Sequence, residues 1–199
     1  MSPTERQITA AVDGYWLVGE ISSSGNRIQD VLKDGSSEIL RMINVRVCDY
    51  GQPSSPRESL PEMLIPKGQV TYVLPTAEHE APEKRRDNFS SRAAANATVV
   101  LGRYCIHGRV HLPASHYENQ VYTFTTQLGR FFPVTHATLT HYGNTETVLD
   151  VPVVLINKDH VSGFHLGQPA AGDGAPGEQT SVELRSIIAD ESLLSLFRK

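Results

Sequence analysis

The feature that most constrains this chain is an internal repeat. Residues 15–21 and 104–110 both read Y-x-x-x-G-x-[IV], residues 45–51 and 137–143 are alternating stretches that end in Tyr-Gly, and residues 63–70 resemble 154–161. The spacing between the matched positions drifts only from 89 to 92 to 91 residues. Three matches in the same order and at nearly constant spacing predict two copies of one small module, at about 13–75 and 102–166.

Each copy has the residue pattern of β-strands. From Tyr104 to Leu112 the even positions are apolar or glycine, and the odd positions carry Cys105, His107, Arg109 and His111. A period of two predicts a strand with one buried face. The glycine on that inward face, Gly108 and its counterpart Gly19, leaves room for a crossing strand or a sharp bend.

The other elements follow from the same reasoning. Residues 27–32 suggest one helical turn, whereas their counterpart 121–125 favours a strand. The dipeptides Lys67-Gly68 and Lys158-Asp159 predict tight hairpins between the last two strands of each copy. The last three strands of each copy are expected at about 45–49, 62–65 and 69–74 in the first copy and at 134–141, 151–156 and 160–166 in the second.

We therefore expect a mainly β protein with two tandem small β-barrel or β-sandwich modules and a C-terminal amphipathic helix. The sequence leaves open whether the modules form separate barrels or one joint sheet. The segments are a first module over 1–75, a polar linker over 76–101, a second module over 102–166, a Gly/Pro-rich flexible tether over 167–180 and a helix over 181–199.

The order of these elements looks like that of small Sm-like and SH3-like barrels. Gly19, Ile21 and Ile28 resemble the first Sm motif, and residues 64–70, an apolar pair followed by Lys-Gly and a valine, resemble the second. The resemblance implies a five-stranded barrel topology for each copy. The acidic and amide residues of the family's nucleotide pocket are replaced here, so we carry over no nucleotide-binding residue; the replacements are Gly25, Gln29, Ala114 and Glu118.

Two apolar surfaces are candidate interfaces. The outward face of the first copy's strand carries Trp16 and Val18, which need a cover, either the other module, the linker, the tail or another chain. The tail has one apolar helical face, which either folds back on the modules or docks in a partner as a short peptide; its residues are Leu184, Ile187, Ile188, Leu194 and Phe197.

Histidine is concentrated in the second copy, which holds seven of the eight. His107, Arg109, His111 and His136 are expected to point outward and are the candidate ligand or metal residues. Two histidines at i and i+4 on a strand lie about 13 Å apart, so a metal would need a residue from a neighbouring strand. Solvent-facing histidines without a ligand are the simpler interpretation.

No nucleophile elbow, phosphate-binding loop or pair of catalytic acids is found, which favours a non-enzymatic protein without a cofactor. The net charge of -4 argues against nucleic acid, and no apolar run is long enough for a membrane span. The start of the sequence lacks the apolar core of a signal peptide, so we expect a cytoplasmic protein. The leading hypothesis is a binding or scaffold protein that contacts a protein partner or itself. The alternatives are Sm-like nucleic-acid binding and a metal-assisted enzyme that uses the histidine-rich face.

Overall fold

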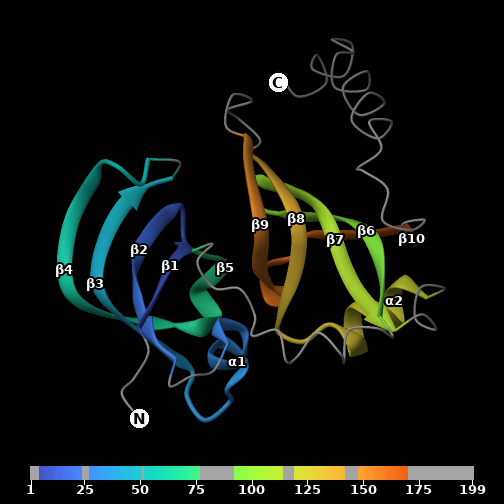
Figure 1. The fold of residues 1–199 in the computed structure, drawn as a ribbon, viewed down its shortest axis with the longest axis horizontal. Coiled ribbons are helices and arrows are strands. Elements are labelled where there is room, and N and C mark those ends of the chain that lie inside the picture. The colour runs from blue at the N-terminus through green and yellow to red at the C-terminus, as the bar shows by residue number, and fades with distance from the viewer. Residues whose placement is uncertain are drawn as a thin grey trace, which may run out of the picture. The chain divides into compact units, whose positions relative to one another are not determined.

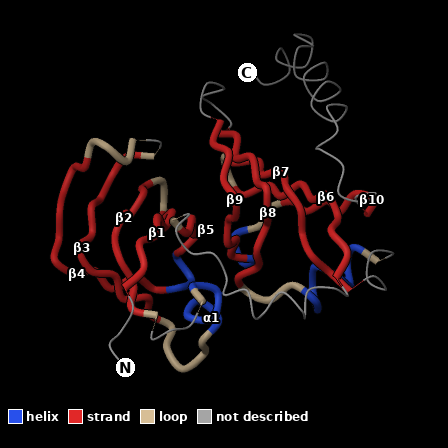
Figure 2. Tube along the Cα trace, viewed as in Figure 1, coloured by secondary structure: helices blue, strands red, loops and turns tan. Residues whose placement is uncertain are grey.

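The structure, a computed structural model, describes residues 5–23, 27–50, 52–76, 92–113, 119–141 and 148–169. These residues form one open antiparallel sheet of ten strands, together with short helices (Figures 1 and 2). The strands are β1 Glu5–Val12, β2 Tyr15–Ser22, β3 Ile39–Asp49, β4 Pro56–Pro66, β5 Val70–Pro75, β6 Arg92–Leu101, β7 Tyr104–Pro113, β8 Phe131–His141, β9 Val148–Asn157 and β10 Gly163–Pro169. The mainly β fold class is therefore confirmed.

The order of the strands in the sheet is the same in the two halves of the chain. The first half is ordered β5-β1-β2-β3-β4, and the second is ordered β10-β6-β7-β8-β9. The two stretches are joined where β5 pairs with β9. One joint sheet is thus formed, which decides between the two arrangements that the sequence left open.

Three sequence expectations about these elements are wrong. Each half begins with a strand that was not expected, and β6 occupies residues 92–101 of the predicted linker. The two Lys-containing dipeptides open 3-10 helices, η1 Lys67–Gln69 and η5 Lys158–His160, instead of hairpins. Residues 121–125 are helical, in α2 Gln120–Tyr122 and the following π-helix η4 Thr123–Gln127. The helical turn expected at 27–32 is found as α1 Ile28–Lys33.

A lysine caps the end of the helix at this place in each half, buried as Lys67 in the first and partly exposed as Lys158 in the second. The Lys67 ammonium donates to the carbonyls of Val31 (2.9 Å) and Asp34 (2.7 Å) at the end of α1. Lys158 does the same for Thr125 (3.2 Å) and Leu128 (3.0 Å) at the end of η4. The last carbonyls of a helix have no partner within it, and a cation there is favoured by the helix dipole.

The two glycines have the role that the pattern predicted, since each faces a bulge in the next strand. A Cβ on Gly19 would lie 2.8 Å from the Ile43 carbonyl oxygen, and one on Gly108 would lie 2.9 Å from that of Thr135. The bulges place Asn44 at φ 53° and His136 at φ 49°. Such bulges bend a sheet sharply, and each five-strand stretch curls in this way around its own core.

The buried side chains form two clusters, one for each half. The first contains twelve residues of the first half, from all five strands and α1, together with Phe131 and Leu155 of the second half. The second cluster belongs mainly to the second half and includes Trp16, Val18 and Tyr72 from the first. Each core is therefore completed by side chains of the other half.

Among the described residues, no helix is both long enough and apolar enough to cross a lipid bilayer. The predicted C-terminal helix, with Leu184, Ile187, Ile188, Leu194 and Phe197, lies outside the described residues.

Candidate assembly interface

The junction between the halves is built on a short stretch of strand pairing. Tyr72 and Val73 of β5 are paired with Ile156 and Leu155 of β9. Beside this pairing Phe131 (0% exposed) and Leu155 (4%) insert into the core of the first half. Burial of an aromatic or leucine side chain stabilises by about 1.5–3 kcal/mol, so the insertion of these two residues is a main apolar contribution to the junction.

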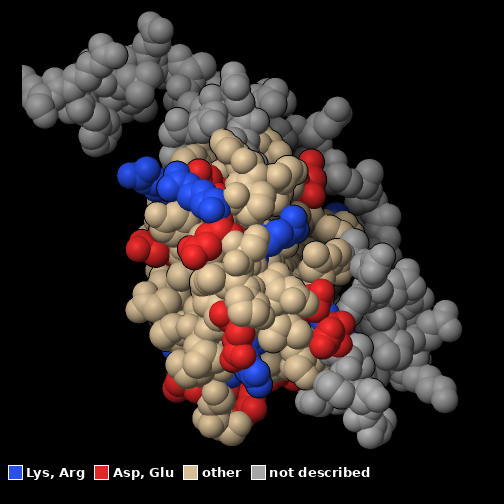
Figure 3. Space-filling view, turned by 90° about the vertical axis from the view of Figure 1, so that its left-hand side faces the viewer, with Lys and Arg blue, Asp and Glu red and all other residues tan. Residues whose placement is uncertain are grey.

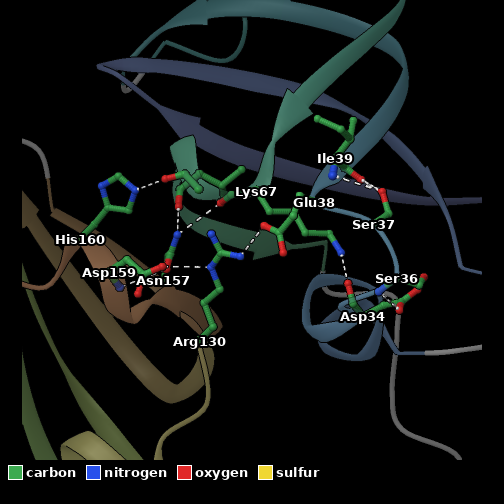
Figure 4. A network of polar contacts seen from close by, with 12 residues as sticks. Asp34, Ser36, Ser37, Glu38, Ile39, Lys67, Arg130, Asn157, Asp159 and His160 are labelled. Carbon is green, nitrogen blue, oxygen red and sulfur yellow. Dashed lines mark hydrogen bonds and ion pairs between the residues drawn. The ribbon is translucent and has the colours of Figure 1, made fainter.

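The polar end of the junction is organised by Asn157, at the end of β9 (Figure 4). Its side-chain amide is 0% exposed and donates to the carbonyls of Val70 (2.8 Å) and Lys67 (3.3 Å) in the first half. His160 donates from Nε2 to the Gly68 carbonyl at 2.7 Å. The second half thus supplies side-chain donors to three carbonyls of η1 and the start of β5, and the Lys67 carbonyl also accepts from the backbone N–H of Val70.

An ion pair lies beside this network. Arg130 donates from its NH1 nitrogen to Glu38 of the first half at 2.7 Å and from Nε to Asp159 at 3.0 Å. The hydrogen bond from Arg130 lowers the pKa of the Glu38 carboxyl group. Both partners are partly exposed, at 33% and 68%, and exposed pairs of this kind contribute little stability. The larger effect of such ion pairs is on the specificity of the contact between two surfaces.

The opposite end of the junction is aromatic. Trp16 donates from Nε1 to the Tyr72 hydroxyl at 3.0 Å, and its ring lies 4.9 Å from that of Tyr50. Tyr104 of the second half packs on Tyr50 at 4.7 Å and on Tyr72 at 5.7 Å, and His141 lies 5.1 Å from Tyr50. Burial raises the pKa of Tyr104 to about 12 and that of Tyr72 well above its usual value. These hydroxyls therefore stay neutral at physiological pH.

Trp16 and Val18, which the sequence singled out as apolar groups needing a cover, are each 6% exposed. They belong to the cluster made mostly of second-half residues. Trp16 is thus a residue of the aromatic end of the junction.

The candidate histidines are spread over the sheet and hydrogen-bonded locally. His107 contacts the Thr98 hydroxyl through Nδ1 (3.1 Å) and the Cys105 thiol through Nε2 (3.4 Å), and burial lowers its pKa. His111 contacts the Thr135 hydroxyl at 2.9 Å. Of the four residues expected to point outward, only His136 is exposed. His107, Arg109 and His111 are half-buried, so the expectation of a solvent-facing strand surface is wrong for them. Across the described part of the chain, no three His, Cys, Asp or Glu side chains are grouped so that they could hold a metal ion.

The sheet formed by the described residues ends in β4 on one side and β10 on the other. The β4 side carries exposed apolar residues, Ile39 at 42% and Leu64 at 62%. On this face, which is turned toward the viewer in Figure 3, acidic and basic side chains lie around uncharged surface. Two of the charges form a two-point ion pair across the strands, Arg41 with Glu62 at 2.8 and 2.9 Å.

A hollow of about 420 Å³ lies beside this edge. Its wall combines apolar side chains with polar groups of α1 and η1, and among its lining residues are Ile21, Val31, Ile39, Leu40, Asp34 and Lys67.

Sequence reasoning missed the polar residues of the junction, which are Lys67, Arg130 and Asn157. Each acts on a residue far away in the sequence: Arg130 and Glu38 are 92 positions apart, and Asn157 and Lys67 are 90 apart. The one signal in the sequence was the match between the turns that contain Lys67 and Lys158, since a lysine retained in both copies suggests a shared structural role.

No protein-family model matches the chain, and no curated protein and no solved structure is significantly similar to it.

Proposed function

We propose that this protein is a non-enzymatic scaffold whose binding surface is the open β4 edge of its sheet. The observation that carries the proposal is the contrast between β4 and the matching strand β9. Leu155 of β9 is 4% exposed where it packs into the core of the first half, whereas Leu64 at the matching position of β4 is 62% exposed. An open strand beside apolar side chains is a template for the addition of a further strand.

Within this proposal, each five-strand stretch of the joint sheet is an opened relative of a small Sm-like or SH3-like barrel, and both derive from one repeated module. Its support is the repeated strand order, the lysine-capped helix in each half and the glycine opposite a bulge in each half. In such an arrangement the shared residues provide the scaffold, and function lies in the surfaces that differ between the halves.

Site-specific photo-crosslinking in cells tests the proposal. A photoreactive amino acid is placed at Leu64 and, as the matched control, at Val148, which is 55% exposed at the first residue of β9, in the other half of the chain. We expect protein adducts several-fold more abundant at position 64 than at position 148. Equal yields at the two positions would show that the β4 edge is ordinary surface, and the scaffold proposal would then be abandoned.

A further inference from the structure

The residues exposed along β4 are the positional equivalents of those that close the junction within the chain. Ile39 is opposite Pro66 in the β3–β4 pairing, as Phe131 is opposite Asn157 in the β8–β9 pairing. Leu64 likewise matches Leu155 by strand register. The exposures are reversed, at 42% and 62% in the first half against 0% and 4% in the second. The face that is buried in the second half is therefore exposed in the first half.

The internal junction also has a receiving surface, formed in the first half beside β5. Residues equivalent to this receiving surface lie at the opposite end of the sheet, at β10. Val73 is paired with Ala10, and Phe164 is paired with Val99 at the same place in the second half. Val70 and Val73 are both 0% exposed where β9 covers them. Their equivalents Val161 and Phe164, at η5 and β10, remain partly exposed.

From this reciprocity we infer that the protein associates head to tail with a second copy of itself, the β4 edge of one copy pairing with the β10 edge of the next. The contact repeats the β5–β9 junction, with Leu64 opposite Phe164 and Ile65 opposite Gly163. Because the two surfaces differ, a pair of copies still has one free surface of each kind, and the assembly either closes into a ring or extends. The inference rests on the proposed function and specifies its partner.

The charges at the junction agree with this pairing. The backbone amide of Lys67 donates to the Glu38 carbonyl, and that of Lys158 donates to the Arg130 carbonyl, so Glu38 and Arg130 hold the same position in the two halves. Within the chain Arg130 of the second half meets Glu38 of the first. Between copies, the same two positions would be held by Glu38 of the incoming first half and Arg130 of the receiving second half, each of which is also paired within its own chain. A negative and a positive charge therefore face each other in both contacts, although the first half inserts in one and receives in the other.

One difference makes the contact between copies weaker than the internal junction. Pro66 replaces the buried Asn157, whose amide satisfies two carbonyls in the internal junction. An association that lacks these hydrogen bonds is expected to be reversible and dependent on concentration.

Sedimentation velocity of the purified full-length chain over a range of concentrations tests the inference. We expect wild type to sediment faster as concentration rises. Leu64→Asp should weaken the association by about 10- to 100-fold, the range for exposing a buried leucine. Val148→Asp, a substitution at a similarly exposed residue, should leave it unchanged. A wild-type chain that remains monomeric at the highest concentration, or one that assembles equally with Leu64→Asp, overturns the inference.

The direction of the contact is tested by crosslinking. Light and ¹⁵N-labelled copies are mixed, and a photoreactive residue at position 64 is expected to capture residues 161–166 of the other copy. Capture of position 64 by position 64, or of the chain's own C-terminal segment, contradicts the head-to-tail arrangement. If the purified protein does not self-associate but position 64 captures a different protein in cells, this inference fails while the scaffold proposal stands. If neither occurs, both fail.

Discussion

The buried amide of Asn157 allows a quantitative test of the junction. Asn157→Leu conserves most of the side-chain volume but removes the donor to the carbonyls of Lys67 and Val70. Asn157, Lys67 and Val70 are 0%, 3% and 0% exposed, so water does not readily replace the lost hydrogen bonds. A buried polar group left without a partner costs about 1–3 kcal/mol. Because the Lys67 carbonyl keeps the backbone N–H of Val70 as a donor, we count one such loss and expect the free energy of unfolding to fall by about 1–3 kcal/mol.

Urea unfolding measures this loss, with linear extrapolation to water. The fluorescence of Trp16, the one tryptophan of the chain, reports on the far end of the same junction. Asn96→Leu, at an exposed asparagine of β6, is the matched control and should change stability by less than about 0.5 kcal/mol. A loss below about 1 kcal/mol for Asn157→Leu would refute the claim that this amide holds the halves together.

Three further predictions concern the interior of the sheet. Gly108→Ala places a Cβ 2.9 Å from a backbone oxygen and should cost about 1–3 kcal/mol of unfolding free energy, whereas Gly163→Ala, whose closest contact is 3.5 Å, should be nearly neutral by the same urea titration. Burial lowers the pKa of His107, so the unfolded chain binds the proton more readily and stability falls as pH drops below about 6.5; a thermal melting series should show a flatter fall for His107→Gln, and an unchanged pH profile would contradict this. Tyr72→Phe removes the acceptor of the Trp16 indole N–H and should cost about 1–3 kcal/mol, with equal melting temperatures of variant and wild type as the opposing result.

The strands predicted from the sequence are those with clear alternation. β7 and β8 bury Ile106, Val110, Ala137 and Leu139 on the faces that the pattern assigned, although Cys105 on the other face of β7 is also buried. Gly19 and Gly108 could be placed opposite a crossing strand because a glycine on an inward strand face usually marks a bulge or a close approach of another backbone. Sequence reasoning succeeded at positions where a residue type has one usual structural role, as glycine has on an inward strand face.

The elements that were missed have local signals that the tertiary structure overrides. β6 contains three consecutive alanines, a helix-favouring run, yet it is paired along its whole length with β7. Residues 121–125 are rich in β-branched and aromatic side chains, yet they are helical with their end capped by Lys158. Propensity is a weak guide when long-range pairing or a buried cap decides the conformation.

The junction could not be predicted at residue level. The β5–β9 pairing covers two residue pairs, and its stability depends on side chains brought together from both halves. Trp16 and Val18 indicated that a covered face exists, but nothing local identified Phe131, Leu155 or Asn157 as the residues that reach across.

The opposite charges of Glu38 and Arg130 have a consequence for how such a protein can evolve. Because these residues hold the same position in the two halves, two first halves would place carboxylate against carboxylate there, and two second halves guanidinium against guanidinium. Like charges brought together disfavour a wrong partner even where an opposite pair adds little stability. Once the halves had acquired these charges, neither could replace the other. Loss of one half could then not be compensated by the other, which would preserve both within a single gene.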